Sequence, residues 1–183
     1  MEDKIDKLVF LDIDGVMTSV ADGTSYLCMD PSCYSLSCTA TSNLFRILDS
    51  TNACVVIHST WVKWRGDVDH KWGFPIPGTN RRIWFESLLF DLISVLSDDN
   101  RYLDCVRHES GRNKRGDIEE WLETHRGILA DNCRILILDD DPTMELDQVS
   151  FGNSDVMFLN CNPLTGLTKG DSDKAIEFLG IHG

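Results

Sequence analysis

The sequence predicts a three-layer α/β domain, in which helices cover both faces of a parallel, Rossmann-like sheet. Short apolar runs alternate along the chain with segments of helical periodicity, which is the pattern of strand–helix–strand units. Several of these runs end directly in polar side chains, as strands do at the ligand-binding edge of such a sheet. At 183 residues the chain is long enough for one full core, and we expect residues 1–183 to form a single domain.

The first strand is predicted at Leu8–Leu11, a continuous apolar run that suits a strand buried on both faces. Asp12 and Asp14 follow it, and Gly15 then allows a sharp exit from the strand. Residues two apart in an extended segment point to the same side, so both carboxylates can face one pocket. Two carboxylates held together repel each other, which calls for a divalent cation. Taken alone, the tetrapeptide Asp-Ile-Asp-Gly is equally compatible with an acidic turn.

The stretch 18–42 is polar and rich in Ser, Thr and Cys, and it predicts a loop or small hairpin above the sheet edge. A helix is expected to begin near Thr41. The second buried strand is predicted at 53–58 and ends at Ser59-Thr60. Glycines and prolines then predict a loop at 61–80. We therefore expect two small insertions in the domain, a flap at 16–40 and the loop at 61–80.

The second half of the chain continues the alternation of helices and strands. The predicted helices are 81–96, 116–125 and 171–179, the last capped by Asp171, and the predicted strands are 101–107, 133–138 and 155–160. The strand at 133–138 runs straight into three consecutive aspartates, 139–141. Because parallel strands place their carboxyl ends on one edge, these aspartates are expected near those that follow the first strand.

The acidic strand ends suit phosphoryl transfer. Asp12, closest to its strand, can attack phosphorus and form an aspartyl-phosphate. Asp14, one step further out, can protonate the leaving oxygen and then deprotonate the attacking water. A hard cation such as Mg²⁺ prefers oxygen ligands, and Asp12, Asp139 and the backbone carbonyl of Asp14 are candidates. The aspartates 139–141 are also compatible with an acidic turn before a proline.

Polar and basic residues complete the predicted site. Ser59 can donate a hydrogen bond to a phosphoryl oxygen, and we assign Thr60 beside it to the same phosphate site. Lys114 or Arg115, at the start of a helix, can offset the charge of the phosphoryl group in the transition state. Each pair has a plainer interpretation: a helix N-cap for Ser59-Thr60 and a solvated basic pair for the other two.

The order Asp-x-Asp-Gly, strand–Ser, Lys/Arg and strand–Asp-Asp resembles the haloacid dehalogenase (HAD) superfamily. More narrowly, four segments resemble the HAD domain of "Swiss army knife" RNA-repair proteins: 55–61, 115–122, 137–141 and 166–168. The resemblance covers about residues 8–179. It implies a Mg²⁺-dependent phosphohydrolase, with catalytic and ligand residues as follows: Asp12 as nucleophile, Asp14 as acid/base, Ser59 and Lys114 or Arg115 on phosphate, and Asp139 with Asp140 on the metal.

The sequence departs from that family in one motif, because Val62 follows Trp61 where an arginine is common; Lys63 or Arg65 is a candidate replacement. Family members often carry cap domains over the site. The segments available for one are short here, so we expect a capless or minimally capped enzyme that admits bulky substrates. The tryptophans 61, 64, 72 and 84 are candidates for stacking on a base or for ordinary packing.

The formal charge of −13 opposes non-specific binding to nucleic acid. Residues 61–115 are locally basic, with ten Lys/Arg against eight Asp/Glu, and can still bind a phosphate-bearing substrate. No stretch approaches the roughly 18 apolar residues of a membrane span, and we expect no membrane partner and a cytoplasmic location. The seven cysteines are expected to be reduced thiols; Cys28, Cys33 and Cys38 fit no common zinc pattern, and their role stays open.

The sequence therefore predicts a phosphatase acting on a nucleotide or a nucleic-acid terminal phosphate. A small-metabolite or protein phosphatase of the same fold is the alternative within enzymes of this type. A metal-dependent nuclease and a non-catalytic phosphoacceptor module are the alternatives of other classes. The sequence indicates neither a preference for 3′ or 5′ phosphate nor an oligomeric state.

Overall fold

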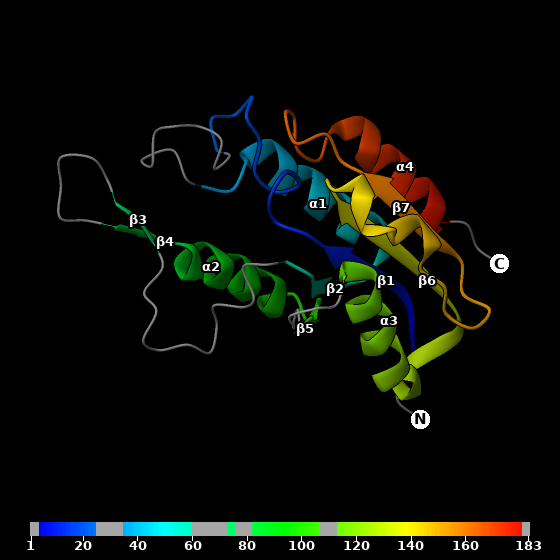
Figure 1. The fold of residues 1–183 in the computed structure, drawn as a ribbon. Coiled ribbons are helices and arrows are strands. Elements are labelled where there is room, and N and C mark those ends of the chain that lie inside the picture. The colour runs from blue at the N-terminus through cyan, green and yellow to red at the C-terminus, as the bar shows by residue number, and fades with distance from the viewer. Residues whose placement is uncertain (1–3, 25–34, 60–72, 76–81, 107–112, 181–183) are drawn as a thin grey trace.

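The computed structural model describes residues 4–24, 35–59, 73–75, 82–106 and 113–180. Its main sheet has five parallel strands in the order β5-β2-β1-β6-β7 (Figure 1). These strands are β1 (Ile5–Leu11), β2 (Cys54–Ile57), β5 (Tyr102–Cys105), β6 (Leu129–Asp139) and β7 (Val156–Asn160). The parallel α/β fold that the sequence predicts is confirmed.

Helices cover both faces of this sheet. They are α1 (Cys38–Thr51), α2 (Phe85–Asp98), α3 (Lys114–Thr124) and α4 (Lys169–Gly180). Apolar residues of α1, α2 and α4 pack in one core with Val9 and Leu11 of β1. Leu8 and Phe10 point to the opposite face, where they share a second core with α3. The alternation of side chains along one central strand thus supplies both cores, which is why its whole apolar run is buried.

The strand register brings the predicted site residues to the same level. Leu11 is paired with Ile57 of β2 on one side and with Leu138 of β6 on the other. The residues that follow these three therefore leave the sheet side by side. Two backbone bonds continue the ladder past the strand ends, from the Asp12 N–H to the Leu138 carbonyl (2.9 Å) and from the His58 N–H to the Leu11 carbonyl (2.8 Å).

Several helix boundaries differ from the sequence prediction because capping side chains lie upstream. Helix α1 begins at Cys38 rather than near Thr41, since the Ser37 hydroxyl accepts the Ala40 N–H (3.1 Å) and caps it. Helix α3 begins at Lys114 rather than 116, with Asn113 as its N-cap. Helix α4 begins at Lys169.

The N-terminus of α4 is closed by a reciprocal pair of side chains rather than by an aspartate alone. The Thr168 hydroxyl accepts the Asp171 N–H (3.2 Å), while the Asp171 carboxylate accepts the Thr168 N–H (3.2 Å). This arrangement is a capping box, so the N-cap is Thr168 and the predicted cap, Asp171, lies in the first turn.

Two strand predictions also need correction. Residues 82–84, predicted as the start of a helix, form strand β4 (Arg82–Trp84), which pairs antiparallel with β3 (Gly73–Pro75) inside the predicted loop 61–80. Pairing with a separate segment overrides the helical spacing there. Strand β6 begins at Leu129, four residues before the predicted start, because Leu129 pairs with Ile5 of β1. The rest of the 61–80 loop, Thr60 and Cys28 and Cys33 lie outside the described residues.

Five cysteines in the described ranges carry free thiols: 38, 54, 105, 133 and 161. The helices of these same ranges include none that is both long and apolar enough to cross a membrane.

Replacing Phe10 with Ala tests the core that joins β1 to α3. The Phe10 side chain is fully buried and meets the Trp121 ring edge-on, with centroids 5.5 Å apart. We expect the free energy of unfolding to fall by about 3–5 kcal/mol, because the substitution removes buried apolar surface and leaves a cavity. Val95→Ala, at a half-exposed position of α2, is the control and should cost less than about 1 kcal/mol. Equal losses in urea unfolding would contradict the packing described.

Candidate active site

The candidate site lies at the carboxyl edge of the sheet, between β1 and β6. In the sheet, β2 and β5 lie beyond β1 on one side of this pair, and β7 lies beyond β6 on the other. The order of the strands therefore reverses between β1 and β6, which is the position where ligands bind in open α/β sheets. Asp12 follows β1, Asp139 ends β6, and Lys114 begins α3 beside them. Three segments distant in the sequence therefore contribute to one cluster, as the order of motifs predicts.

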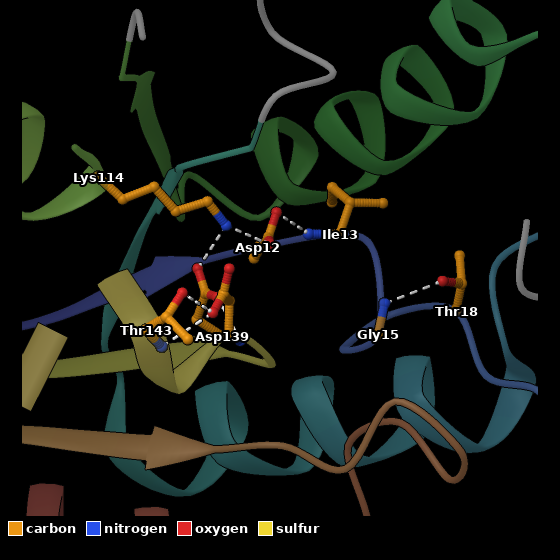
Figure 2. A network of polar contacts seen from close by, with 8 residues as sticks. Asp12, Ile13, Gly15, Thr18, Lys114, Asp139 and Thr143 are labelled. Carbon is orange, nitrogen blue, oxygen red and sulfur yellow. Dashed lines mark hydrogen bonds and ion pairs between the residues drawn. The ribbon is translucent and has the colours of Figure 1, made fainter. Parts of the chain in front are cut away.

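The Lys114 ammonium lies between two buried carboxylates (Figure 2). Its Nζ is 2.6 Å from Asp12 Oδ2 and 2.7 Å from Asp139 Oδ2. Asp12 is 4% exposed, Asp139 0% and Lys114 8%, so water screens these interactions little. A single cation thus compensates two desolvated charges.

Backbone amides fix the second oxygen of each carboxylate. Asp12 Oδ1 accepts the N–H of Ile13 (2.8 Å), and Asp139 Oδ1 accepts the N–H of Asp141 (2.9 Å). Asp141 is itself held in a turn, because its carboxylate accepts the Thr143 N–H (2.8 Å) and hydroxyl (2.6 Å). Both carboxylates are therefore oriented before any ligand binds.

Burial and the charges of neighbouring groups shift the pKa of each group in the cluster. Desolvation raises the pKa of Asp12 above its usual range, although Lys114 acts against this shift. Desolvation and the Asp12 charge raise the pKa of Asp139 to about 6. Burial would lower the pKa of Lys114, but the two carboxylates outweigh it and raise that pKa. The lysine stays charged at neutral pH, and the carboxylates gain from any further cation nearby.

Asp140 adds a third carboxylate. Asp12, Asp139 and Asp140 each offer an oxygen, and these oxygens lie within 4.8 Å of one another. Burial and the neighbouring Asp139 charge raise the pKa of Asp140. Gly15, with φ +66°, makes room for this side chain, because a Cβ on residue 15 would lie 2.1 Å from Asp140 Oδ2. Three hard oxygen donors against one ammonium are a donor set that fits a divalent cation such as Mg²⁺.

Four predicted site residues remain: Ser59, Asp14, Thr60 and Arg115. Ser59 is buried and its side chain hydrogen-bonds to Asp12, which opposes the larger effect of desolvation that raises the pKa of that carboxyl. Asp14 is half-buried in the turn that follows Asp12. Thr60 lies outside the described residues.

Arg115, the alternative to Lys114, points to other partners. Its Nε lies 3.0 Å from Glu119 Oε1, and one terminal nitrogen lies 2.8 Å from Gln148 Oε1. Successive residues of a helix are about 100° apart around its axis, so only one of the two basic residues can face the carboxylates. That residue is Lys114.

Sequence reasoning missed some residues that orient the site. Asn113 was not assigned a role, yet its side chain accepts the Gly116 N–H (2.9 Å) and sets the start of α3, which brings Lys114 to the cluster. Asn before a helical run is a recognised N-cap signal and could have revealed it. The Thr143 contact with Asp141 had no such clear signal, because many acidic turns lack this partner.

Comparison with known proteins identifies the family of the chain. No curated protein and no solved structure matched the chain. One family model, described as the HAD domain in Swiss Army Knife RNA repair proteins, matches residues 8–172, which include every described residue of the cluster. The match covers well over half of the sequence. The chain therefore belongs to this family of HAD domains.

Proposed function

We propose that this protein is a Mg²⁺-dependent phosphohydrolase that works through an aspartyl-phosphate on Asp12. Membership of the HAD family indicates a phosphohydrolase in general terms. The observation that carries the proposal is the buried Asp12 carboxylate, held 2.6 Å from the Lys114 ammonium at the ligand-binding edge of the sheet. A desolvated, oriented carboxylate next to a fixed cation is suited to attack an anionic phosphoryl group.

In the first step, an oxygen of Asp12 attacks phosphorus, and the bond between phosphorus and the leaving oxygen breaks. Asp14 gives a proton to the leaving oxygen, so that an alcohol departs rather than an alkoxide. In the second step, water attacks the phosphorus of the aspartyl-phosphate, and Asp14 takes the proton from this water. Inorganic phosphate leaves and the Asp12 carboxylate is regenerated.

Lys114 and Ser59 support both steps. The ammonium beside Asp12 offsets the negative charge that three phosphoryl oxygens bring into a buried site. The Ser59 hydroxyl donates its one proton to Asp12 and can rotate to donate it to a phosphoryl oxygen instead when a substrate is bound. Thr60 is proposed for the same phosphate site from its place after Ser59.

Asp12, Asp139 and Asp140, with the backbone carbonyl of Asp14, would hold the metal. The closeness of three carboxylate oxygens supports this assignment. When bound, Mg²⁺ supplies charge neutralisation and orientation of the phosphoryl group.

We infer that the substrate is a nucleotide or a nucleic-acid terminal phosphate. The description of the family, which names RNA repair proteins, supports this inference. Small metabolites and phosphoproteins are the competing substrates, and cleavage of internal phosphodiesters would indicate a nuclease.

The principal test measures release of inorganic phosphate with Mg²⁺ and with EDTA. The substrates are an aryl phosphate, mononucleotides, 3′- and 5′-phosphorylated oligonucleotides, a sugar phosphate and a phosphopeptide. We expect metal-dependent release, fastest on a nucleotide or an oligonucleotide end. Asp12→Asn keeps the size of the side chain and should lower kcat at least about 10³-fold, because the nucleophile is lost.

The control for Asp12→Asn is Asp131→Asn, at a surface carboxylate whose side chain is 99% exposed, which should keep wild-type activity. Phosphate release by Asp12→Asn at the wild-type rate would exclude the covalent mechanism. Shortened oligonucleotides without free phosphate would favour the nuclease, and a stable aspartyl-phosphate without turnover would favour the phosphoacceptor module.

Lys114 and Arg115 form a second, matched comparison. We expect Lys114→Ala to lower kcat about 10²- to 10³-fold, because a preorganised charge at the reacting group is lost. Lys114→Arg, which retains the charge, guards against a loss caused by misfolding and should recover part of the rate. Arg115→Ala removes a partly exposed ion pair with Glu119 and should change kcat less than about tenfold. Equal effects at the two positions would contradict the assignment of Lys114.

A further inference from the structure

The segment that follows β7 carries the motif Gly166-Leu-Thr, to which the proposed chemistry assigns no role. Residues 162–167 form a tight turn, here named the post-β7 turn. The Asn162 carbonyl accepts the N–H groups of Thr165 (2.9 Å) and Gly166 (2.8 Å). The Asn162 side chain accepts the Leu164 N–H (2.9 Å). Hydrogen bonds among its own residues therefore close this turn.

The post-β7 turn is bonded to the segment that leaves β1. The Leu167 N–H donates to the Val16 carbonyl (2.8 Å), and the Ala21 N–H donates to the Leu164 carbonyl (2.8 Å). The Asn43 side chain of α1 donates to the Leu167 carbonyl (2.9 Å), which fixes the turn to the body of the domain. Segments about 145 residues apart thus share one backbone network.

Gly166 is the residue of the post-β7 turn that lies against the backbone of the segment leaving β1. Its φ of +66° is strained for any residue with a side chain. A Cβ at this position would lie 2.9 Å from the Val16 carbonyl oxygen and 3.3 Å from that of Thr18. Any larger residue must therefore push these two carbonyls away.

Val16 and Thr18 belong to the turn that contains Asp14. The Ile13 carbonyl accepts the N–H groups of Met17 (2.8 Å) and Thr18 (3.2 Å), which closes the turn. The Thr18 hydroxyl accepts the Gly15 N–H (3.2 Å), and Thr18 is fully buried (Figure 2). That N–H belongs to the peptide unit that joins Asp14 to Gly15. Contacts thus lead from Gly166 through Thr18 to the backbone beside Asp14.

We propose that the post-β7 turn is a positioning element for Asp14, acting through Gly166 and Thr18. The inference rests on the proposed function, in which Asp14 transfers a proton to the leaving oxygen. Proton transfer demands hydrogen-bond distance to that oxygen, so a small shift of the Asp14 backbone weakens it. Attack by Asp12 depends much less on this turn, because Asp12 is held from the sheet side: its carboxylate accepts the Lys114 ammonium, and its N–H donates to the Leu138 carbonyl of β6 (2.9 Å).

The test compares two substrates with Mg²⁺ present. An aryl phosphate with a strongly acidic phenol as its leaving group needs little protonation, whereas a mononucleotide releases a sugar alcohol and needs a proton donor. We expect Gly166→Ala to lower kcat on the mononucleotide at least about 30-fold, and on the aryl phosphate less than about threefold. Thr18→Val, which deletes the hydroxyl, should show the same selective loss, and Thr18→Ser should restore activity.

Gly23→Ala is the matched control. Gly23 has φ +67°, almost the same as Gly166, but a Cβ there would meet no atom within 4 Å. Gly23→Ala carries the same backbone strain without the contact and should change kcat on the two substrates by the same factor. Hydrogen exchange supplies a readout besides activity: the amides of Leu167 and Ala21 should exchange at least about tenfold faster in Gly166→Ala than in Gly23→Ala.

The outcomes separate this inference from the proposed function. A wild-type protein inactive on every phosphate would overturn the proposed function and the role of the turn with it. An active wild type, with equal losses on both substrates in Gly166→Ala, would overturn the positioning role alone. Unchanged exchange at Leu167 and Ala21 would also overturn it, because the contact at Gly166 would then not hold the two segments together.

Discussion

The site depends on one ammonium group placed between two buried carboxylates. Lys114 joins α3 to β1 through Asp12 and to β6 through Asp139. Removing three charges from water is costly, and the arrangement is tolerable only because the charges lie within hydrogen-bond distance and the other carboxylate oxygens accept backbone N–H groups. The two carboxylates and the ammonium together carry one net negative charge, and the carboxylate of Asp140 adds a second. This imbalance favours a further cation beside the carboxylates, and burial is the main reason why the pKa values of these carboxyls are raised.

The apolar sheet makes this costly arrangement possible. Leu11 and Leu138 are fully buried neighbours, and their pairing places Asp12 beside Asp139. Burial of the strands' apolar side chains on both faces supplies the free energy that offsets desolvation of the charged groups. The two cores also hold the carboxylates still, because the strands that carry them are packed from above and below. Packing in the interior and chemistry at the edge are therefore coupled in this fold.

Two glycines set the spacing around the acidic turn. Gly15 allows the Asp140 side chain to approach the turn after β1, and Gly166 allows the post-β7 turn to approach the backbone of the same segment at Val16 and Thr18. Both have positive φ and both lie where a Cβ would collide with a neighbour. The turn that contains Asp14 thus lies against Asp140, which follows β6, and against the segment after β7, neither of which is near it in the sequence.

Local patterns in the sequence are sufficient to predict the five strands of the main sheet and the acidic residues that follow two of them. A continuous apolar run at Leu8–Leu11 marks a central parallel strand, and aspartates at its end mark the edge where ligands bind. Which of Lys114 and Arg115 faces the carboxylates depends on the tertiary structure, since neighbours on a helix face different directions and the packing of α3 on the sheet turns Lys114 toward them. The tertiary structure also determines that residues 82–84 form a strand, because these residues pair with β3, and the local periodicity of a sequence does not reveal pairing between separate segments.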